Sequence, residues 1–272
     1  SITQRMEQPK PRITEQYSAL ANIYDEVMKD VSYAAWTEYI DRIIHEHHPD
    51  PADLLELACG TGTMAVEMSH LDDYNIVATD RSPQMIGMAQ KKAKKYGSGV
   101  EFEVMDFLDF QLGRTFDVIY MVFDSINYVH SESEIQTLQR NAFDHLNPGG
   151  LFIFDFTTPR NSHKAIQYLD KMSGESGPWR YRRSSRYEPD ECIHINEFTI
   201  IKTGSEPDET DQRYVEKHRQ KIYTLDEMLT MVAPSPFSLI AAYDGFTLNP
   251  AGQKSLRITM VLQRSESDSD VA

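Results

Sequence analysis

The sequence predicts an α/β protein in which a seven-stranded, mostly parallel sheet is covered by helices on both faces. Short apolar runs alternate with segments of helical periodicity from residue 53 to residue 156. The first of these runs leads directly into a glycine turn, Gly60-Thr61-Gly62. The chain has 272 residues, 40% hydrophobic and 25% charged, so it can bury the core of one or two domains. Parallel strands need a helical crossover between them, so this alternation indicates a parallel sheet buried on both faces.

The elements follow in order along the chain. Residues 14–47 carry apolar and aromatic side chains at helical spacing, which predicts two helices with a break near Asp30, ended by Pro49 and Pro51. Strands are expected at residues 53–58, 75–79, 100–105, 116–122, 151–156, 237–246 and 255–264, and the last is expected to be antiparallel. Helices are expected at residues 62–70, from Pro83, around residues 135–146 and at residues 225–232 behind a Thr224 cap, with a turn at residues 147–150.

Residues 159–223 interrupt this alternation. A helix at residues 160–171 and a loop at residues 174–178 are expected to lead into three strand-like runs, at residues 179–188, 192–202 and 213–223. We therefore expect a small antiparallel sheet inserted into the main domain, which comprises residues 14–158 and 224–264. The insert is expected to line a substrate pocket or form a dimer contact, and residues 1–13 and 265–272 are expected to be flexible tails.

Composition narrows the classes of function and partner. The net charge of −15 disfavours nucleic acid, because binding to phosphate backbones rests on Lys and Arg. The four arginines Arg180, Arg182, Arg183 and Arg186 are expected to lie on a solvated strand face, and an anionic substrate is the alternative. Only two cysteines occur, no apolar run approaches the roughly 18 residues of a membrane span, and the first twelve residues contain no apolar secretory segment. We therefore expect a cytoplasmic protein with no membrane partner.

Two features point to a nucleoside ligand. The Gly60-Thr61-Gly62 turn joins a strand to a helix, and glycine is needed where a ligand approaches the main chain closely. The turn also fits a dinucleotide fingerprint, so it is weak by itself. Asp80 ends the next strand-like run, where its carboxylate can accept both hydroxyls of a ribose. The structural alternative for Asp80 is a helix cap, but Ser82 is better placed for that role.

Two further strand ends favour a nucleoside over a dinucleotide. Asp106 ends the third strand, where its carboxylate can accept an adenine amine while the next backbone N–H donates to the ring. The fourth strand ends in Phe123 and Asp124, followed by Asn127 and Tyr128, which is the composition of a pocket wall. In open α/β sheets ligands bind in the crevice at such carboxyl ends.

These motifs resemble a known family. ELACGTGT, VATDRSPQMI, FEVMDF, FDVIYMVFDSINYV and HLNPGGLFIFDF resemble, in order and spacing, the motifs of class I S-adenosylmethionine-dependent methyltransferases, over about residues 14–264. The resemblance implies a Rossmann-like fold, S-adenosylmethionine as cofactor and a small-molecule acceptor. The opening helices, the accessory sheet and EKHRQKIYTLDEM are similar to a bacterial subgroup that includes amino-sugar N,N-dimethyltransferases. A homodimer is the oligomeric state expected.

The resemblance also implies roles for individual residues. Glu56 and the backbone of residues 58–62, which includes Ala58, Gly60, Thr61 and Gly62, would hold the methionine part of the cofactor; Asp80, Arg81 and Met85 the ribose and adenosine; Asp106 and Phe107 the adenine; and Val122 and Phe123 the sulfonium side. Tyr17, Tyr24, Tyr33 and Trp36 would belong to a lid, although core packing is as good an interpretation of each single aromatic residue.

The implied reaction is an in-line displacement of methyl from a sulfonium, which asks mainly for alignment. A base helps only where the nucleophile arrives protonated. His218 is the main candidate, because it lies on the last accessory strand on the same face as Glu216 and Gln220. A half-exposed strand histidine with no catalytic role is the alternative. Tyr24, Asp124 and Tyr128 are further polar candidates.

Two other kinds of protein remain as alternatives. An NAD-dependent oxidoreductase is disfavoured, because about fifty residues precede the first strand and Asp106-Phe107 is present. A non-catalytic S-adenosylmethionine-binding module is the other alternative, since no residue is an unambiguous catalytic base. The histidines at residues 45, 47 and 48 have no evident partner cluster, so no metal site is expected.

Overall fold

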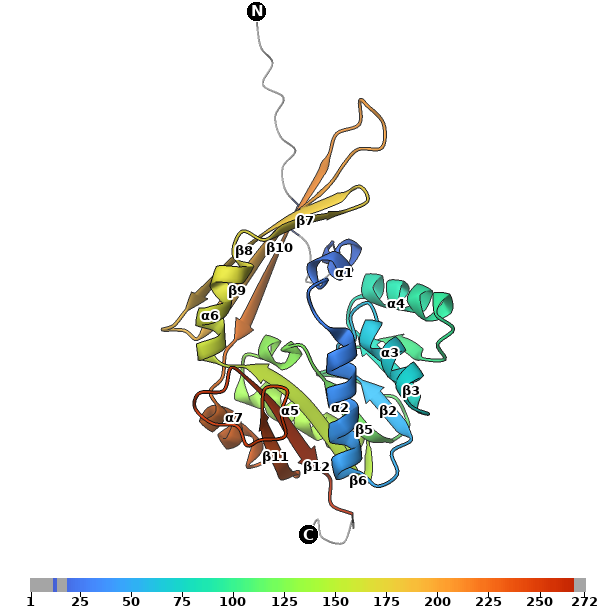
Figure 1. The fold of residues 1–272 in the computed structure, drawn as a ribbon, viewed down its shortest axis with the longest axis vertical. Helices are drawn as coiled ribbons and strands as arrows, with labels where there is room; N and C mark the ends of the chain where they lie inside the picture. The colour runs from blue at the N-terminus through green and yellow to red at the C-terminus, as the bar shows by residue number, and fades with distance from the viewer. Residues whose placement is uncertain (1–11, 14–18, 267–272) are drawn as a thin grey trace, which may run out of the picture.

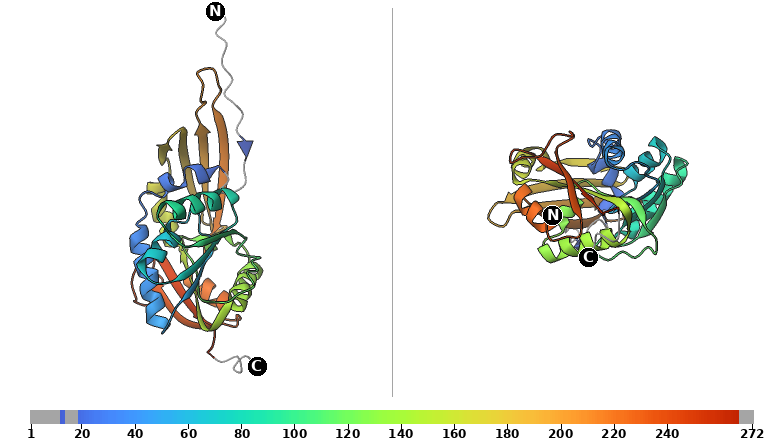
Figure 2. Two further views of the ribbon diagram at one scale, coloured as in Figure 1. Left: turned by 90° about the vertical axis from the view of Figure 1, so that its right-hand side faces the viewer. Right: turned by 90° about the horizontal axis from the view of Figure 1, so that it is seen from below.

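The computed structural model describes residues 12–13 and 19–266 and contains two sheets (Figure 1). The larger sheet has seven strands and forms the lower part of the molecule in Figure 1, and the second sheet rises from it at one end (Figure 2). The predicted fold class, a seven-stranded α/β sheet with an added antiparallel sheet, is confirmed.

The main sheet has the strand order β11-β12-β6-β5-β2-β3-β4. Its strands are β2 (Asp53–Glu56), β3 (Asn75–Asp80), β4 (Glu101–Val104), β5 (Phe116–Met121), β6 (Leu146–Thr157), β11 (Ser238–Asp244) and β12 (Arg257–Gln263). Strands β2 to β6 run parallel, whereas β12 is antiparallel to both of its neighbours, as predicted. The expected turn at residues 147–150 lies inside β6, where Gly149 has φ 81° and the register with β5 shifts.

Helices cover both faces of this sheet (Figure 1). They are α2 (Tyr33–His47), α3 (Thr63–Leu71), α4 (Pro83–Lys95), α5 (Glu132–Asp144) and α7 (Leu225–Val232). Caps explain two of the predicted starts: the Ser82 side chain accepts the Met85 N–H ahead of α4, and Thr224 forms a capping box with Glu227 ahead of α7. The alternating side chains of β5 fill two cores, one under α2, α3 and α4 and the other under α5 and α7.

The second sheet has the order β1-β10-β9-β8-β7. Its strands are β1 (Arg12–Ile13), β7 (Ser173–Ser176), β8 (Trp179–Glu188), β9 (Ile193–Lys202) and β10 (Gln212–Lys221), and α6 (Pro159–Leu169) leads into it. The loop expected at residues 174–178 is wrong, because Ser173–Ser176 pairs with β8 through a turn at Gly177, whose φ is 54°. This short edge strand was not predicted because its sequence, Ser-Gly-Glu-Ser, has no apolar alternation. The parallel pairing of β1 with β10 was also not predicted.

The N-terminal segment bridges the two sheets. After η1 (Leu20–Asn22) and α1 (Tyr24–Val27) the chain breaks before α2, close to the predicted Asp30. Leu20, Ile23 and Val27 pack against Tyr181 and other apolar side chains of β8 and β9. Tyr17, assigned to the lid, lies outside the described residues. Within the described residues, no helix has the length and apolar character needed to cross a membrane.

Candidate functional site

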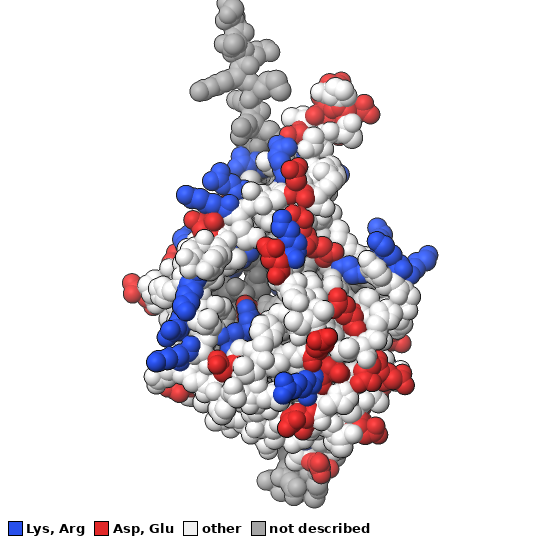
Figure 3. Space-filling model, in the orientation of Figure 1, with Lys and Arg blue, Asp and Glu red and all other residues white. Residues whose placement is uncertain are grey.

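A cavity of about 830 Å³ lies where the carboxyl ends of β2, β3 and β5 face the second sheet. Figure 3 shows the surface hollowed near the centre of this face. The predicted residues that line the cavity are Tyr24, Tyr33, Trp36, Glu56, Ala58, Gly60, Thr61, Asp80, Arg81, Asp106, Phe107, Phe123, Asp124 and His218. Gly62, Met85 and Val122 do not line it. They pack behind the wall, and the Met85 side chain is fully buried.

The glycine turn explains why Gly60 and Gly62 differ. Both have positive φ, 56° and 80°. A Cβ on Gly60 would lie 3.2 Å from the Tyr24 ring at the cavity, whereas one on Gly62 would lie 2.8 Å from the Ala89 Cβ inside the core. Gly60 therefore leaves room at the cavity, and Gly62 allows α3 to approach α4 closely.

Glu56 is a buried carboxylate with one oxygen that makes no hydrogen bond to the described residues. Its side chain lies at the end of β2, the residue is 2% exposed, and within the described residues Oε2 has no hydrogen-bond partner. Burial and the nearby negative charge of Asp80 raise its pKa well above the ordinary value. Such an orphaned oxygen at a cavity wall fits a cationic ligand group, for example the ammonium of a bound amino acid moiety.

Asp80 and Asp106 are held by backbone N–H groups. Asp80 Oδ2 accepts from Gly60 and Oδ1 accepts from Ser82, each at 2.9 Å. Burial raises the pKa of Asp80, and these two bonds lower it in part. Asp106 Oδ1 accepts the Leu108 N–H at 2.9 Å. Each carboxylate oxygen keeps a lone pair, so both side chains are oriented and can still accept from hydroxyl or amine groups.

A polar latch joins α1 to the glycine turn. The Thr61 hydroxyl donates to Asp25 Oδ1 at 2.6 Å, and Lys92 Nζ donates to Asp25 Oδ2 at 2.8 Å. Lys92 also donates to Thr61 and to Thr63, at 3.0 and 2.7 Å. We call Asp25, Thr61, Thr63 and Lys92 the latch. It holds the helix that carries Tyr24 over the cavity.

The wall after β5 is strained and aromatic. Phe123 and Asp124 are consecutive non-glycine residues with positive φ, 61° and 62°, a costly conformation that concentrates at functional sites. The Phe123 ring lies 5.0 Å from Trp36 and 5.2 Å from Tyr33, both edge-on. Trp36 and Tyr33 therefore both pack in the core and line the cavity.

Asp124 belongs to a charged triad at this wall. Arg257 binds the Asp124 carboxylate with both terminal nitrogens and also binds Asp155. Asp155 is fully buried, and burial followed by the charge of Asp124 raises its pKa to about 7, despite Arg257. The guanidinium also lies 5.2 Å from the Trp36 ring. Since Arg257 occupies its carboxylate, Asp124 is poorly placed to accept a proton from an acceptor.

His218 is enclosed rather than half-exposed. The residue is 1% exposed, its Nδ1 lies 3.0 Å from the Tyr128 hydroxyl and its Nε2 lies 3.1 Å from Glu216 Oε2. Glu216 Oε1 accepts the backbone N–H groups of Ala19 and Leu20. Both ring nitrogens are thus engaged, and a chain of polar groups runs from the cavity residue Tyr128 through His218 to η1, the start of the lid.

The sequence analysis did not predict several residues of the site. Asp25 pairs with Lys92, and Arg257 pairs with Asp155, through contacts between elements far apart in the chain. His194 and Asn196 line the cavity from β9, and their alternation with Ile193 and Ile195 was a readable sign of a polar strand face. Of the four arginines on β8, Arg180 and Arg186 pair with Asp211 and Glu188, and Arg183 lines the cavity.

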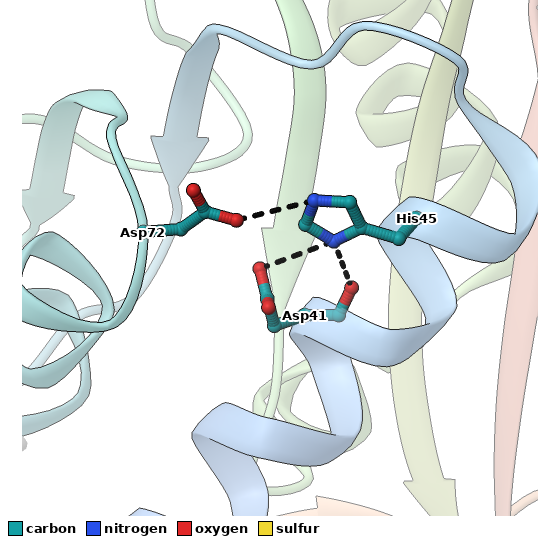
Figure 4. Close-up of side chains that lie close together, drawn as sticks. All are labelled: Asp41, His45 and Asp72. Atoms are coloured by element: carbon teal, nitrogen blue, oxygen red, sulfur yellow. Dashed lines mark hydrogen bonds and ion pairs between the residues drawn. The ribbon is translucent and has the colours of Figure 1, made fainter.

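The histidine run does have carboxylate partners. His45 Nε2 lies 3.1 Å from Asp72 and its Nδ1 3.5 Å from Asp41, on α2 (Figure 4). The two carboxylates approach opposite nitrogens of one ring, and Nδ1 also contacts the Asp41 carbonyl oxygen at 2.9 Å. These contacts link α2 to the end of α3 near the surface, and none of the three residues lines the cavity.

Comparison with known proteins identifies the domain. Residues 54–150 match the family model of a methyltransferase domain. A protein of Geobacillus sp. (strain WCH70), provisionally named a methyltransferase, is 24% identical over 91% of this chain and 99% of its own. The dTDP-4-amino-2,3,4,6-tetradeoxy-D-glucose N,N-dimethyltransferase of Saccharopolyspora spinosa is 26% identical over 66% of this chain and 76% of its own.

A solved structure shows the same fold. The S-adenosylmethionine-dependent methyltransferase of Clostridium acetobutylicum ATCC 824 superposes with a TM-score of 0.73 and 23% identity, over 90% of this chain and 98% of that one. The predicted Rossmann-like architecture is thereby confirmed. The family model that matches describes a methyltransferase domain and not an oxidoreductase.

Proposed function

Because the chain carries a methyltransferase domain and is an S-adenosylmethionine-dependent methyltransferase, we propose that it methylates a nitrogen or oxygen nucleophile of a small molecule by in-line displacement. The observation that carries the proposal is a cavity that joins the ends of β2 and β3 to the polar face of the second sheet. A cofactor at the strand ends would leave the rest of this volume for an acceptor.

The residues at the strand ends suit the cofactor. In this proposal the unpartnered oxygen of Glu56 receives the ammonium group, and Asp80 receives the ribose hydroxyls. Asp106 and Phe107 hold the adenine, and Phe123 lies beside the sulfonium. Tyr24 covers Gly60, and burial raises its pKa well above the ordinary value, so its hydroxyl stays protonated and can donate a hydrogen bond.

Alignment supplies most of the catalysis. S-adenosylmethionine, when bound, supplies an electrophilic methyl group on a sulfonium. The walls around it hold an acceptor in line, which can contribute about 7–11 kcal/mol. Where the nucleophile arrives protonated, we propose that its proton passes to the Tyr128 oxygen while the Tyr128 hydroxyl proton passes to His218 Nδ1, with Glu216 Oε2 accepting the His218 Nε2–H. His218 would therefore act on the acceptor through Tyr128 and not by direct contact.

A small polar acceptor agrees with the relatives and with the charge. The relative from Saccharopolyspora spinosa is named for an amino sugar, which supports an amine-bearing acceptor of that size. The net charge of −15 supports a partner other than nucleic acid. We further propose a cytoplasmic homodimer, with residues 159–223 as an insert in the domain formed by residues 14–158 and 224–264.

The test is a transfer assay with labelled cofactor. The purified protein is incubated with methyl-labelled S-adenosylmethionine and the small-molecule fraction of a bacterial extract, and label in the small molecules is followed with release of S-adenosylhomocysteine. Label in a small molecule supports the proposal. Tight cofactor binding by calorimetry, without transfer to any acceptor, would favour the non-catalytic binding module instead.

A further inference from the structure

The buried face of the second sheet is unusually polar. A sheet face packed against a protein core is normally apolar. Here His194 and Asn196 of β9 lie opposite Gln220 and His218 of β10, and all four line the cavity. His194 is 4% and Asn196 5% exposed. Buried polar side chains need hydrogen-bond partners, so each of them can be examined for a bonding position that the protein leaves open.

His194 leaves one such position open while its other ring nitrogen is bonded. Its Nε2 lies 2.7 Å from the Ser185 hydroxyl of β8. For Nδ1 no hydrogen bond is found within residues 12–13 and 19–266. Of the neighbours of His194, His218 has both nitrogens engaged, by Tyr128 and Glu216. One amide atom is bonded in each of the other two: the Asn196 carbonyl oxygen accepts from Arg183 Nε at 3.0 Å, and Gln220 Nε2 donates to the Asp124 carbonyl oxygen at 3.3 Å. His194 therefore brings an anchored ring with an open nitrogen to the cavity wall.

The anchor is itself held in place. The Ser185 N–H donates to Asp170 Oδ1 at 3.0 Å, which ties β8 to the residue that ends α6. Ser185 is 5% exposed, so water competes little for its hydroxyl. Burial, together with the positive charge of Arg183, lowers the pKa of His194 to about 4, so the ring is neutral near pH 7. A neutral imidazole can meet a hydroxyl or an amine without adding positive charge to the cavity.

We propose that His194 is an acceptor-binding residue whose Nδ1 hydrogen-bonds a hydroxyl or amine group of the methyl acceptor. The inference rests on the proposed function and adds to it the side chain that selects the acceptor. It places the acceptor against β9, across the cavity from the strand ends assigned to the cofactor. An acceptor without a hydroxyl or amine at that position would leave Nδ1 buried without a partner and would bind less tightly.

Two amide substitutions separate binding from anchoring. In His194→Gln the amide can reach the Nε2 position and keep the bond to Ser185, but nothing occupies the Nδ1 position. In His194→Asn the amide lies near the Nδ1 position, and the Ser185 bond is lost. Ser185→Ala is the matched control, because it removes the anchor and leaves the imidazole.

The assay uses methyl-labelled S-adenosylmethionine with the small-molecule fraction of a bacterial extract supplemented with amino sugars. We expect His194→Gln to lower kcat/KM for the labelled acceptor by roughly 10- to 100-fold, mainly through KM, with the Kd for S-adenosylhomocysteine and the Tm close to wild type. His194→Asn should retain more acceptor affinity than His194→Gln and lose more stability.

The outcomes are distinct. If wild type transfers methyl and His194→Gln matches its kcat/KM within a factor of three, the assignment of His194 is overturned and the proposed function stands. If the losses in His194→Gln and Ser185→Ala follow the fall in Tm alone, the ring is structural and the assignment is again overturned. If wild type binds the cofactor but labels no small molecule, the proposed function fails, and the acceptor role of His194 fails with it.

Discussion

The backbone N–H of Gly60 donates to Asp80 Oδ2 at 2.9 Å, which ties the turn after β2 to the last residue of β3. One carboxylate thus shapes the glycine turn and faces the cavity assigned to the cofactor. Folding and ligand binding are coupled at this contact, so a substitution there must be measured for both.

Asp80→Ala should weaken S-adenosylmethionine and S-adenosylhomocysteine alike. Each lost bond to the carboxylate costs about 1.5–3 kcal/mol. The Tm should fall too, because the Gly60 and Ser82 N–H groups lose their acceptor. Asp80→Asn is the matched control, since it keeps one acceptor oxygen and should lose less. Calorimetric titration measures the Kd of both ligands. An unchanged Kd in the alanine variant would contradict the assignment of Asp80 to the ribose.

Glu56→Gln should stabilise the unliganded protein and weaken cofactor binding. Burial and Asp80 raise the pKa of Glu56 in the folded state above its unfolded value. Its stabilising contribution is therefore fully present below the unfolded pKa of about 4.3 and is lost as pH rises toward the folded pKa. The Tm of wild type should fall relative to Glu56→Gln over that range. Asp155, whose pKa is also raised, is common to both proteins, so the difference isolates Glu56.

The same group predicts a proton release. If Glu56 receives the cofactor ammonium, binding lowers its pKa, and a proton leaves wherever the free protein held one. Titrations in two buffers of different ionisation enthalpy measure this release. It should vanish in Glu56→Gln, and a release of equal size in the variant would contradict the assignment.

Gly60→Val should abolish cofactor binding in a folded protein. A Cβ there would lie 3.2 Å from the Tyr24 ring, and φ of 56° strains any side chain with a branched Cβ. Gly62→Ala is the contrast, because its Cβ would lie 2.8 Å from Ala89 in the core and should lower the Tm instead. Normal titration by the Gly60 variant would mean that the turn is structural only.

The latch should control how quickly the cofactor leaves. Asp25→Asn and Lys92→Met remove charged bonds between α1 and the glycine turn. We expect each to speed dissociation of S-adenosylhomocysteine about 3- to 10-fold, a modest effect because Asp25 is partly solvated. Stopped-flow fluorescence of Trp36 follows dissociation in a Trp179→Phe background. Glu26→Gln, which breaks only the neighbouring pair with Lys29, should change nothing.

Tyr128 and His218 should behave as one unit. If His218 acts through Tyr128, then Tyr128→Phe, His218→Ala and the double variant should lose similar turnover, roughly 10²-fold or more, with cofactor affinity little changed. The measurement is turnover at saturating cofactor, corrected for folded fraction. Additive losses would argue for separate roles. Rates within a factor of a few of wild type would leave alignment as the sole source of catalysis.

Residues that act from the end of a strand were readable from the sequence. Glu56, Gly60, Asp80 and Asp106 each follow an apolar run within a few residues. In a parallel sheet all such ends meet at one edge, so local spacing predicts a shared site. The antiparallel last strand and the Thr224 cap were predictable for the same reason, because turn length and caps are local properties.

Contacts across the fold were not readable in this way. His218 was predicted as the main candidate for a catalytic base, with a half-exposed strand position as the alternative. Its burial and its contacts with Tyr128 and Glu216 depend on how β10 docks on η1 and on η2 (Ser125–Tyr128). Asp124 was predicted as a polar candidate for catalysis, and no sequence signal indicated that Arg257, on the last strand, binds its carboxylate. The strand at Ser173–Ser176 was missed because its polar residues carry no alternation, and only pairing with β8 makes it a strand.

The sequence by itself determined the α/β class and the cofactor to which its motifs correspond, because periodicity, glycine turns and strand-end acids are encoded locally. Only the tertiary structure decided which side chains face an acceptor. That face is assembled from α1, η2 and the inner side of β8, β9 and β10, where open hydrogen-bonding positions arise from packing between elements distant in the chain. The open Nδ1 of His194, whose Nε2 is bonded to Ser185, results from such packing and not from any motif.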